Sequence, residues 1–308
     1  TNLFEKSLMS RDIGFGQIST FCSPRHLSVI IKNIDLKQKN QIIEKRGPRL
    51  GSNEKAIHGF LKSNNIQEND IVIKDTKNGK FYFYLHQING INTSEVLPEI
   101  INEIINNFVW PKSQRWAYSE LRWARPLRNI LLLFNNQPIE GKVAIDKNKF
   151  LNFSTYTFGH RNENKKIVVE NIDEYERLLE NNYLIVDRKK RKNKIINDTK
   201  LLLKDTDIKL LDDDYLLDEV LGLVEFPNVL IGTIDKQFMN LPKEVLTTAM
   251  KVHQKYFSII DDKNNLVPKF LFVSNTIPNK ERDKTIIEGN ERVLKARLSD
   301  ADFFWKTD

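Results

Sequence analysis

The sequence predicts an α+β fold in which helices and sheets are mixed in two packed subdomains. Helical and strand-like segments follow one another without a regular strand–helix–strand alternation, which argues against a doubly wound sheet. The chain has 308 residues, of which 40% are hydrophobic, enough for about two domains of roughly 150 residues each. A polar, irregular stretch near residues 136–155 separates the predicted subdomains, 1–140 and 150–308.

The first subdomain is expected to begin with a short β-branched strand at residues 28–31. Ser52 is the predicted cap of a helix with one apolar face, because a serine oxygen satisfies free N–H groups in a first turn. An Asn-Gly turn at 78–79 precedes a strand at 81–88. Ser94 is expected to cap a second helix with a broad apolar stripe.

The second half of the chain alternates apolar runs with amphipathic segments. The predicted strands cover residues 129–134, 183–187, 228–234, 257–260 and 270–273. The predicted helices cover residues 173–179, 187–203, 212–223, 242–256 and 288–308. In the last helix an apolar stripe of Leu294, Leu298, Ala301 and Trp305 is expected to pack against its own domain, leaving charged residues exposed. We expect Arg292, Arg297 and Asp300 on that exposed flank to contact another module.

Composition limits the possible functions. The net charge of +7 points weakly to an anionic partner. The single cysteine, Cys22, excludes an internal disulfide or a cysteine-based zinc site and favours a reducing, cytoplasmic compartment. No apolar run approaches the roughly 20 residues of a membrane span, so no membrane partner is expected. The five histidines are scattered and predict no metal site, and no phosphate loop or nucleophile motif is present.

The densest basic run lies at residues 186–195. Its candidates for phosphate contacts are Lys189, Lys190, Arg191 and Lys192, because lysine and arginine supply most nonspecific nucleic-acid affinity. The alternative is a solvated helix face with apolar residues buried behind it. Basic residues in a first turn oppose the helix dipole, which slightly favours the functional interpretation.

A second candidate surface interleaves aromatic and basic residues at 110–129. The aromatic residues are Trp110, Trp116, Tyr118 and Trp123, and the basic ones are Arg115, Arg122, Arg125 and Arg128. Such a mixture suits base stacking or a protein interface, but it also fits aromatic side chains packed inward with solvated arginines. Farther on, the string TFGHR offers His160 and Arg161 beside a glycine turn, as weaker candidates for a phosphate contact.

Several long strings, in order, resemble the β subunit of the bacterial two-subunit glycyl-tRNA synthetase. They are FCSPRHLSVII, WPKSQRWAYSELRWARPLRNILLL, TFGHR, DEVLGLVEFPNVLIG, LPKEVLTTAMKVHQKYF and EGNERVLKARLSDADFF. The collinear match spans almost the whole chain. The chain looks like an amino-terminal portion, without the HD-like and anticodon-binding regions of that family, and the resemblance implies a B3/B4-like region.

The resemblance implies a part in the ATP-dependent attachment of glycine to tRNA-Gly within an α2β2 enzyme. The α subunit would hold the catalytic site and use ATP with magnesium, whereas this chain would need no cofactor and carry no complete active site. Its expected partners are the α subunit and tRNA-Gly, and its expected tRNA contacts are the basic candidates given above.

Two other functions remain open. By analogy with B3/B4 editing modules, the chain could hydrolyse mischarged tRNA, with candidates His160, Arg161, His253 and Lys255. That function requires at least two of them to meet in one pocket with perturbed pKa values. Glycine is the smallest amino acid, so a synthetase pocket excludes larger ones sterically and editing is less needed. The third possibility is an assembly domain without any RNA contact.

Overall fold

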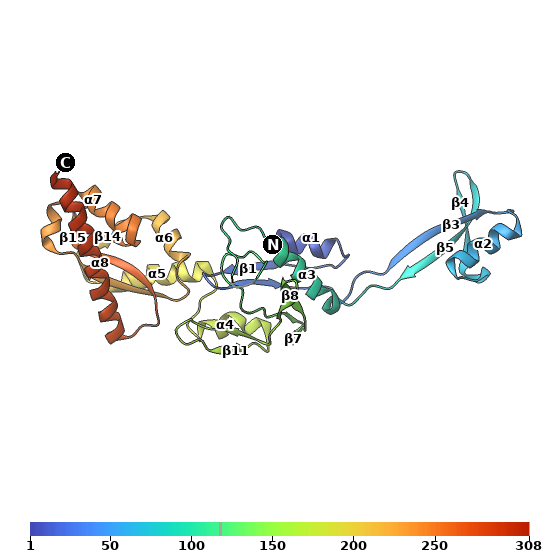
Figure 1. Cartoon of the computed structure of the whole chain (residues 1–308), viewed down its shortest axis with the longest axis horizontal. Coiled ribbons are helices and arrows are strands. Elements are labelled where there is room, and N and C mark those ends of the chain that lie inside the picture. Colours follow the sequence, from blue (N-terminus) through green and yellow to red (C-terminus); the bar gives the residue numbers. More distant parts are fainter. Residues whose placement is uncertain (117–118, 308) are drawn as a thin grey trace.

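The computed structural model describes residues 1–116 and 119–307. It confirms the α+β fold, because helices and several separate antiparallel sheets alternate irregularly along the chain. The molecule is elongated (Figure 1). A narrow arm projects at one end, a central part holds the amino terminus, and a helix-rich carboxy-terminal part lies at the opposite end.

The central part begins with helix α1 (Asn2–Met9) and a hairpin of β1 (Ile18–Cys22) and β2 (Leu27–Ile31), in which Ile18 pairs with Ile31. Helix α3 (Thr93–Asn107) packs against α1. The sequence analysis did not predict α1 or β1. The buried side chains between these elements are Leu8, Ile13, Val96, Ile100 and Ile104.

The rest of the central part consists of short hairpins and one small helix. The elements are β6 (Leu133–Phe134), β7 (Gln137–Pro138), β8 (Lys142–Asp146), β9 (Lys149–Asn152), β10 (Tyr156–Phe158), β11 (Lys166–Val168) and α4 (Tyr175–Glu180), preceded by a 3-10 turn at Ile172–Glu174. Their core contains Ile167, Leu179, Leu184 and Val186. Phe21 of β1 packs against this core, so residues far apart in the sequence share it.

The arm comprises residues 37–92, which begin and end at the bridge between Lys37 and Asn92. It contains β3 (Gln41–Arg49), α2 (Glu54–Asn64), a 3-10 turn (Glu68–Asp70), β4 (Ile71–Thr76) and β5 (Gly79–Ile88). The three strands form one antiparallel sheet in the order β3-β5-β4. Gly79 has a φ of +106° at the predicted Asn-Gly turn, where other residues would be strained.

The carboxy-terminal part is a four-stranded sheet covered on both faces. Its strands are β12 (Ile208–Leu210), β14 (Phe257–Asp261), β15 (Leu266–Asn275) and β13 (Pro227–Thr233), in that order across the sheet. Its helices are α5 (Arg188–Leu202), α6 (Asp214–Leu221), α7 (Lys243–Thr248) and α8 (Lys280–Thr307), with a 3-10 turn at Lys236–Asn240.

Alternation along the strands assigns the two faces of this sheet. Phe270 and Phe272 point to the α7–α8 side, where they meet Leu294 and Leu298 of α8. Leu271 points to the other side, toward the core of α5 and α6. Gly232 of β13 leaves room for the Phe270 ring, because a Cβ there would lie 2.5 Å from it.

Helix α7 continues into a π-helical turn at Ala249–Gln254, which ends at Lys255 in a left-handed conformation. The turn delivers Tyr256 into the core, where its ring stacks on Phe270 with centroids 4.6 Å apart. The Tyr256 hydroxyl donates a 2.5 Å hydrogen bond to Oδ1 of Asn290 on α8. This bond fixes the axial position of the long helix on the sheet.

Of the predicted strands, 183–187 is wrong and 129–134 is confirmed only in part. Tyr183 is an exposed turn residue with a φ of +56°, and Leu184, Ile185 and Val186 are buried but join no sheet. The carbonyls of Ile185 and Val186 accept hydrogen bonds from an arginine side chain instead of a neighbouring strand. Of residues 129–134, only 133–134 form a strand, because their pairing partner β7 is just two residues long. The cap of α2 is Asn53, one residue after the predicted Ser52, and the cap of α3 is Asn92, two residues before the predicted Ser94.

The predicted apolar stripe of α8 is confirmed only in part. Leu294 and Leu298 are buried, but Trp305 is 59% exposed, as are the neighbouring Phe303 and Phe304 to a similar degree. Among the described residues, no helix combines the length and the apolar character that crossing a bilayer requires.

Candidate functional site

A largely buried cluster of polar side chains joins the central part to the carboxy-terminal part, and we call it the polar seam. It contains five side chains from segments far apart in the sequence: Ser23, His26, His160, Glu225 and Asn275. Ser23 and His26 lie in the β1–β2 turn, His160 follows β10, Glu225 precedes β13, and Asn275 ends β15.

Glu225 is the centre of the polar seam and is completely buried. Its Oε1 accepts a 2.5 Å hydrogen bond from the Ser23 hydroxyl and lies 3.0 Å from Nδ1 of His26. Burial alone would raise the pKa of Glu225, but the hydrogen bonds from His26 and Ser23 outweigh it and lower the pKa below its usual value. Its other oxygen, Oε2, has no partner among the described residues.

The ring of His26 lies between two acceptors. Nδ1 faces the Glu225 carboxylate, and Nε2 lies 3.1 Å from the carbonyl oxygen of Phe158. This arrangement is not a nucleophilic triad, because Ser23 donates to the glutamate and Nε2 of His26 faces a backbone oxygen rather than a hydroxyl. The geometry instead ties three chain segments together.

Asn275 completes the polar seam on the sheet side. Its Oδ1 accepts hydrogen bonds from the backbone N–H groups of Glu225 and Phe226, at 2.9 and 3.1 Å. Nε2 of His160 lies 3.3 Å from the same oxygen. His160 is completely buried, and burial lowers its pKa below the ordinary value despite the hydrogen bond to Asn275. His160 is therefore inaccessible to a phosphate in this structure.

Arg191, predicted to contact phosphate, is also completely buried. Its guanidinium donates to the carbonyl oxygens of Ile185, Val186 and Cys22 at 2.6, 2.9 and 2.7 Å. These bonds connect α5 to the segment 183–187 and to the end of β1. Arg191 is a structural residue here, and we remove it from the candidate RNA contacts.

The neighbouring lysines of α5 remain on the surface, but most have acidic partners. Lys190 lies 2.7 Å from Glu180 and 3.0 Å from Glu176, and these hydrogen bonds raise its pKa. Lys192 lies 3.4 Å from Asp214. These acids, together with the cap by Asp187, explain why basic residues are tolerated in the first turns. Lys189 is exposed and has no ion pair among the described residues.

In the segment 110–128, the described tryptophans are half-buried and the arginines are exposed. Trp110 and Trp123 pack edge to face with centroids 4.9 Å apart, and both contact Phe108. The predicted contacts Arg115, Arg122 and Arg125 are all exposed, as is Arg128. Arg122 is hydrogen bonded to Ser113. The segment borders a cavity of about 610 Å³ that Trp110, Leu121 and Arg122 help to line. Tyr118 lies outside the described residues.

The four candidates for hydrolysis do not meet in one described pocket. His160 is buried in the polar seam, whereas Arg161 is exposed. Nζ of Lys255 lies 2.9 Å from Glu219, at the end of α6. His253 is exposed on the π-helical turn. Neither the cavity beside Trp110 nor the groove along α8 is lined by any of these residues.

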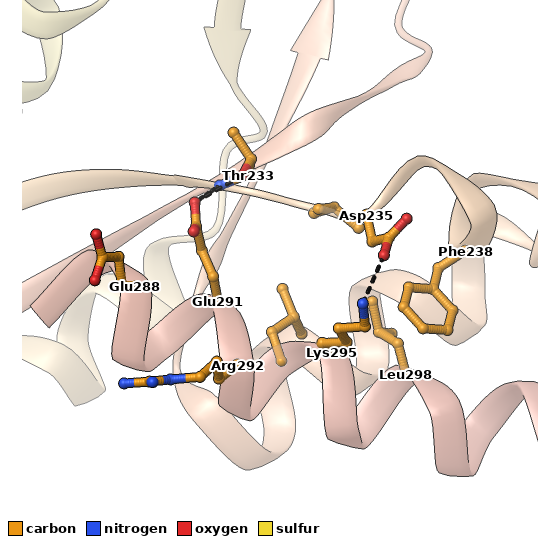
Figure 2. A pocket seen from close by; sticks show the side chains of 10 residues that line it. Thr233, Asp235, Phe238, Glu288, Glu291, Arg292, Lys295 and Leu298 are labelled. Carbon is orange, nitrogen blue, oxygen red and sulfur yellow. Dashed lines mark hydrogen bonds and ion pairs between the residues drawn. The ribbon is translucent and has the colours of Figure 1, made fainter. Parts of the chain in front are cut away.

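A groove of about 530 Å³ lies between α8 and the end of β13 (Figure 2). Glu291 accepts hydrogen bonds from the N–H and hydroxyl of Thr233, both at 2.7 Å, and Lys295 lies 3.0 Å from Asp235. Arg292 extends away from these pairs and is exposed. Arg297 and Asp300 are likewise exposed, and none of the three has an ion pair among the described residues.

Comparison with known proteins identifies the family. The sequence profile described as "Glycyl-tRNA synthetase beta subunit" matches residues 1–308. The chain belongs to the glycyl-tRNA synthetase β-subunit family. Proteins named glycine–tRNA ligase β subunit from Rickettsia canadensis and Rickettsia bellii are 38% identical to it over its full length. The protein of that name from Rhodospirillum centenum is 35% identical over 98% of the chain.

The chain spans about half the length of these family members, 45–46% in the three cases. The resemblance found in the sequence is thereby confirmed. Three of its strings, FCSPRHLSVII, TFGHR and DEVLGLVEFPNVLIG, carry polar-seam residues. The sequence analysis quoted these strings but missed Ser23, His26, Glu225 and Asn275 as a group. The matching strings gave a signal for Ser23, His26 and Glu225, but Asn275 lies in none of them, about 250 positions after Ser23.

Proposed function

We propose that this chain is the RNA-binding and assembly portion of a glycine–tRNA ligase β subunit. In this proposal it supports attachment of glycine to tRNA-Gly in the cytoplasm, and the catalytic site, with its ATP and magnesium, belongs to an α subunit in an α2β2 enzyme. The observation that carries the proposal is the match of the family profile to all 308 residues.

Exposed basic side chains support an RNA contact. Lys189, Arg115, Arg122, Arg125 and Arg161 are all accessible. Phosphate binding needs accessible cations, and acidic partners weaken it by competing for them. Lys189 is therefore a stronger candidate than Lys190 or Lys192, which are paired with acids.

The surface of α8 supports an assembly contact. Arg292, Arg297 and Asp300 lie on its exposed face, while Asn290 and Glu291 are held by Tyr256 and Thr233 of the same part. The proposed contact with the α subunit therefore involves the three exposed charges and leaves out Asn290. Replacing Arg292 and Arg297 by glutamate is expected to weaken co-purification with the α subunit, and unchanged assembly would contradict this contact.

A hydrolytic editing function receives no support from the arrangement of its candidates. It requires two or more of them in one pocket, and His160 is enclosed in the polar seam away from Lys255, which pairs with Glu219. An assembly domain without RNA contact remains the competing proposal, and salt dependence separates the two.

The test is binding of fluorescently labelled tRNA-Gly by anisotropy, with and without purified α subunit, at two salt concentrations. The proposal expects binding that weakens steeply with salt, because released counterions drive phosphate contacts. Binding that is absent, or insensitive to salt, under both conditions would contradict RNA recognition by this chain. Co-purification with the α subunit would then favour assembly alone.

A matched pair of variants on one helix locates the contact. Lys189→Gln with Lys192→Gln is expected to reduce tRNA affinity and the salt slope. Lys200→Gln with Lys204→Gln, at the other end of α5, makes the same change in charge and serves as the control. Equal loss in both variants would show that only net charge matters and that the first turns of α5 are no specific site.

A further inference from the structure

We propose that the projecting arm, residues 37–92, binds the phosphate backbone of RNA through lysines of α2 and of the β4–β5 turn. This inference rests on the proposed function, since it names the surface that would engage tRNA. None of the arm's residues is among the candidates derived from the sequence.

The arm carries most of the chain's excess positive charge. It holds ten of the 48 lysine and arginine residues but only five of the 41 acidic residues. The arm alone therefore accounts for +5 of the net charge of +7. A concentrated positive charge attracts a polyanion at a distance and raises its local concentration. The remainder of the chain is nearly neutral by comparison.

Four lysines of the arm are available for such a contact. Lys55 and Lys62 on α2, and Lys77 and Lys80 at the β4–β5 turn, are exposed and have no ion pair or side-chain hydrogen bond among the described residues. The acid-paired Lys190 and Lys192 of α5 differ from them in this respect. A phosphate can neutralise an unpaired lysine without displacing a protein carboxylate.

The two lysine pairs belong to neighbouring segments. The backbone N–H of Leu50, in the loop before α2, donates a 2.8 Å hydrogen bond to the carbonyl of Lys80. The loop that leads into α2 is thereby fixed to the β4–β5 turn. Lys55 and Lys62 are seven residues apart, which places them on one side of the helix. The four lysines therefore lie on two segments of the arm that are joined to each other, and together they can contact one RNA backbone.

The construction of the arm suits a contact surface rather than a packed domain. Leu61 and Phe83 are its buried apolar side chains, and none of the four core clusters of the described residues includes an arm residue. Strand β3 has nine residues and spans about 30 Å. The arm thus extends well beyond the central part, at the end of the molecule opposite the carboxy terminus (Figure 1).

A protein partner is the main competing occupant, because Ile42 and Ile73 are 64% and 53% exposed on the arm. Lysine, however, is depleted in the cores of protein interfaces, where its flexible chain loses entropy and its charge loses water. Phosphate contacts keep the ammonium group at the solvated surface and release counterions. The number of unpaired lysines therefore favours RNA.

The experiment measures binding of labelled tRNA-Gly to the full chain as a function of salt. The arm variant combines Lys55→Gln, Lys62→Gln, Lys77→Gln and Lys80→Gln. The control variant makes the same change in charge in the carboxy-terminal part, at the exposed residues Lys204, Lys209, Lys236 and Lys284. Circular dichroism verifies that both variants are folded, which is expected because all eight lysines are exposed and none has an ion pair or side-chain hydrogen bond with the part of the chain that the structure describes.

The inference predicts a loss of affinity of about tenfold or more for the arm variant. The slope of log affinity against log salt should fall by roughly 0.7–0.9 for each lost phosphate contact, while the control changes little. If the arm variant binds tRNA as tightly as the wild type, the inference that the arm contacts RNA is refuted, while the proposed function still holds. A third outcome is that both variants keep salt-sensitive tRNA binding but the arm variant no longer co-purifies with the α subunit. That outcome would identify the arm as a protein-docking surface instead. Absence of wild-type binding would refute the arm together with the proposed RNA recognition.

Discussion

His26 and Glu225 lie 199 positions apart in the sequence, yet Nδ1 of the partly buried His26 is 3.0 Å from Oε1 of the completely buried Glu225. The pair joins the β1–β2 turn of the central part to the segment before β13 in the carboxy-terminal part. Because Ser23 binds the same oxygen, one carboxylate organises the contact between the two parts.

Glu225→Ala is expected to reduce the free energy of unfolding by about 3 kcal/mol or more, because it leaves buried donors without an acceptor. A double-mutant cycle with His26→Ala should give a coupling energy of roughly 1 kcal/mol or more. Chemical denaturation measures both quantities. Glu288→Ala, an exposed carboxylate on α8, is the control. Additive effects of the two substitutions would show that the His26–Glu225 contact does not stabilise the protein.

Arg191→Met should reduce the free energy of unfolding by about 3 kcal/mol or more. Methionine fills much of the volume but leaves the carbonyls of Ile185, Val186 and Cys22 without donors. Lys189→Met, two residues earlier on the same helix, is expected to change stability by less than about 0.5 kcal/mol. Thermal and chemical denaturation compare the two variants. Similar stabilities would mean that the Arg191 network contributes little.

Stability is expected to depend on pH through His160 and Glu225. Burial lowers the pKa of His160 from 6.5, so the unfolded chain binds more protons there and stability falls as the pH decreases below about 6.5. The lowered pKa of Glu225, ordinarily 4.5, adds a second loss at pH values below about 4.5. The contribution of His160 to stability is complete above about pH 6.5, and that of Glu225 is complete above about pH 4.5.

Denaturation between pH 8 and pH 4 measures this dependence. His160→Gln should remove the part of the slope below about pH 6.5, because the variant has no group to protonate at that position. His58→Gln, which changes an exposed histidine of the arm, is the control and should leave the slope unchanged. A slope that persists in the His160 variant would assign the dependence to another group.

Tyr256→Phe should reduce the free energy of unfolding by about 1 kcal/mol through loss of the hydrogen bond to Asn290. The same buried position raises the pKa of Tyr256 to about 12, so it should ionise after the exposed tyrosines in a spectrophotometric titration. Tyr215→Phe at an exposed site provides the control. If the group missing from the titration of the Tyr256→Phe variant had an ordinary tyrosine pKa, the burial of Tyr256 would be contradicted.

Local patterns predicted the helices of the carboxy-terminal part well. The cap at Asp187 is confirmed, because its side chain accepts from the N–H groups of Lys189 and Lys190. The strand in 228–234 is also confirmed as β13, since its continuous apolar run is covered by helices on both faces. These features depend on neighbouring residues, so the sequence contains them locally.

Features that depend on distant residues were missed. Segment 183–187 has the composition of a strand, but the carbonyls of Ile185 and Val186 accept from Arg191 rather than from a sheet. Arg191 itself was assigned to an RNA surface because it lies in a run of basic residues. The charge of such a run does not reveal which of its residues faces the core when the run forms a helix. The polar seam combines side chains from four separate segments, and their contacts are set by the tertiary fold.

The position of Glu291 also affects whether molecules of the protein associate through their sheet edges at high concentration. Strand β13 is the outermost strand of its sheet, and an outermost strand with free N–H groups invites pairing with another chain. Glu291 occupies the N–H of Thr233 at the end of that strand and places a carboxylate beside it. A second molecule approaching there would meet a negative charge and a donor already engaged. Helix α8 thus protects the protein from edge-to-edge aggregation at this end of β13.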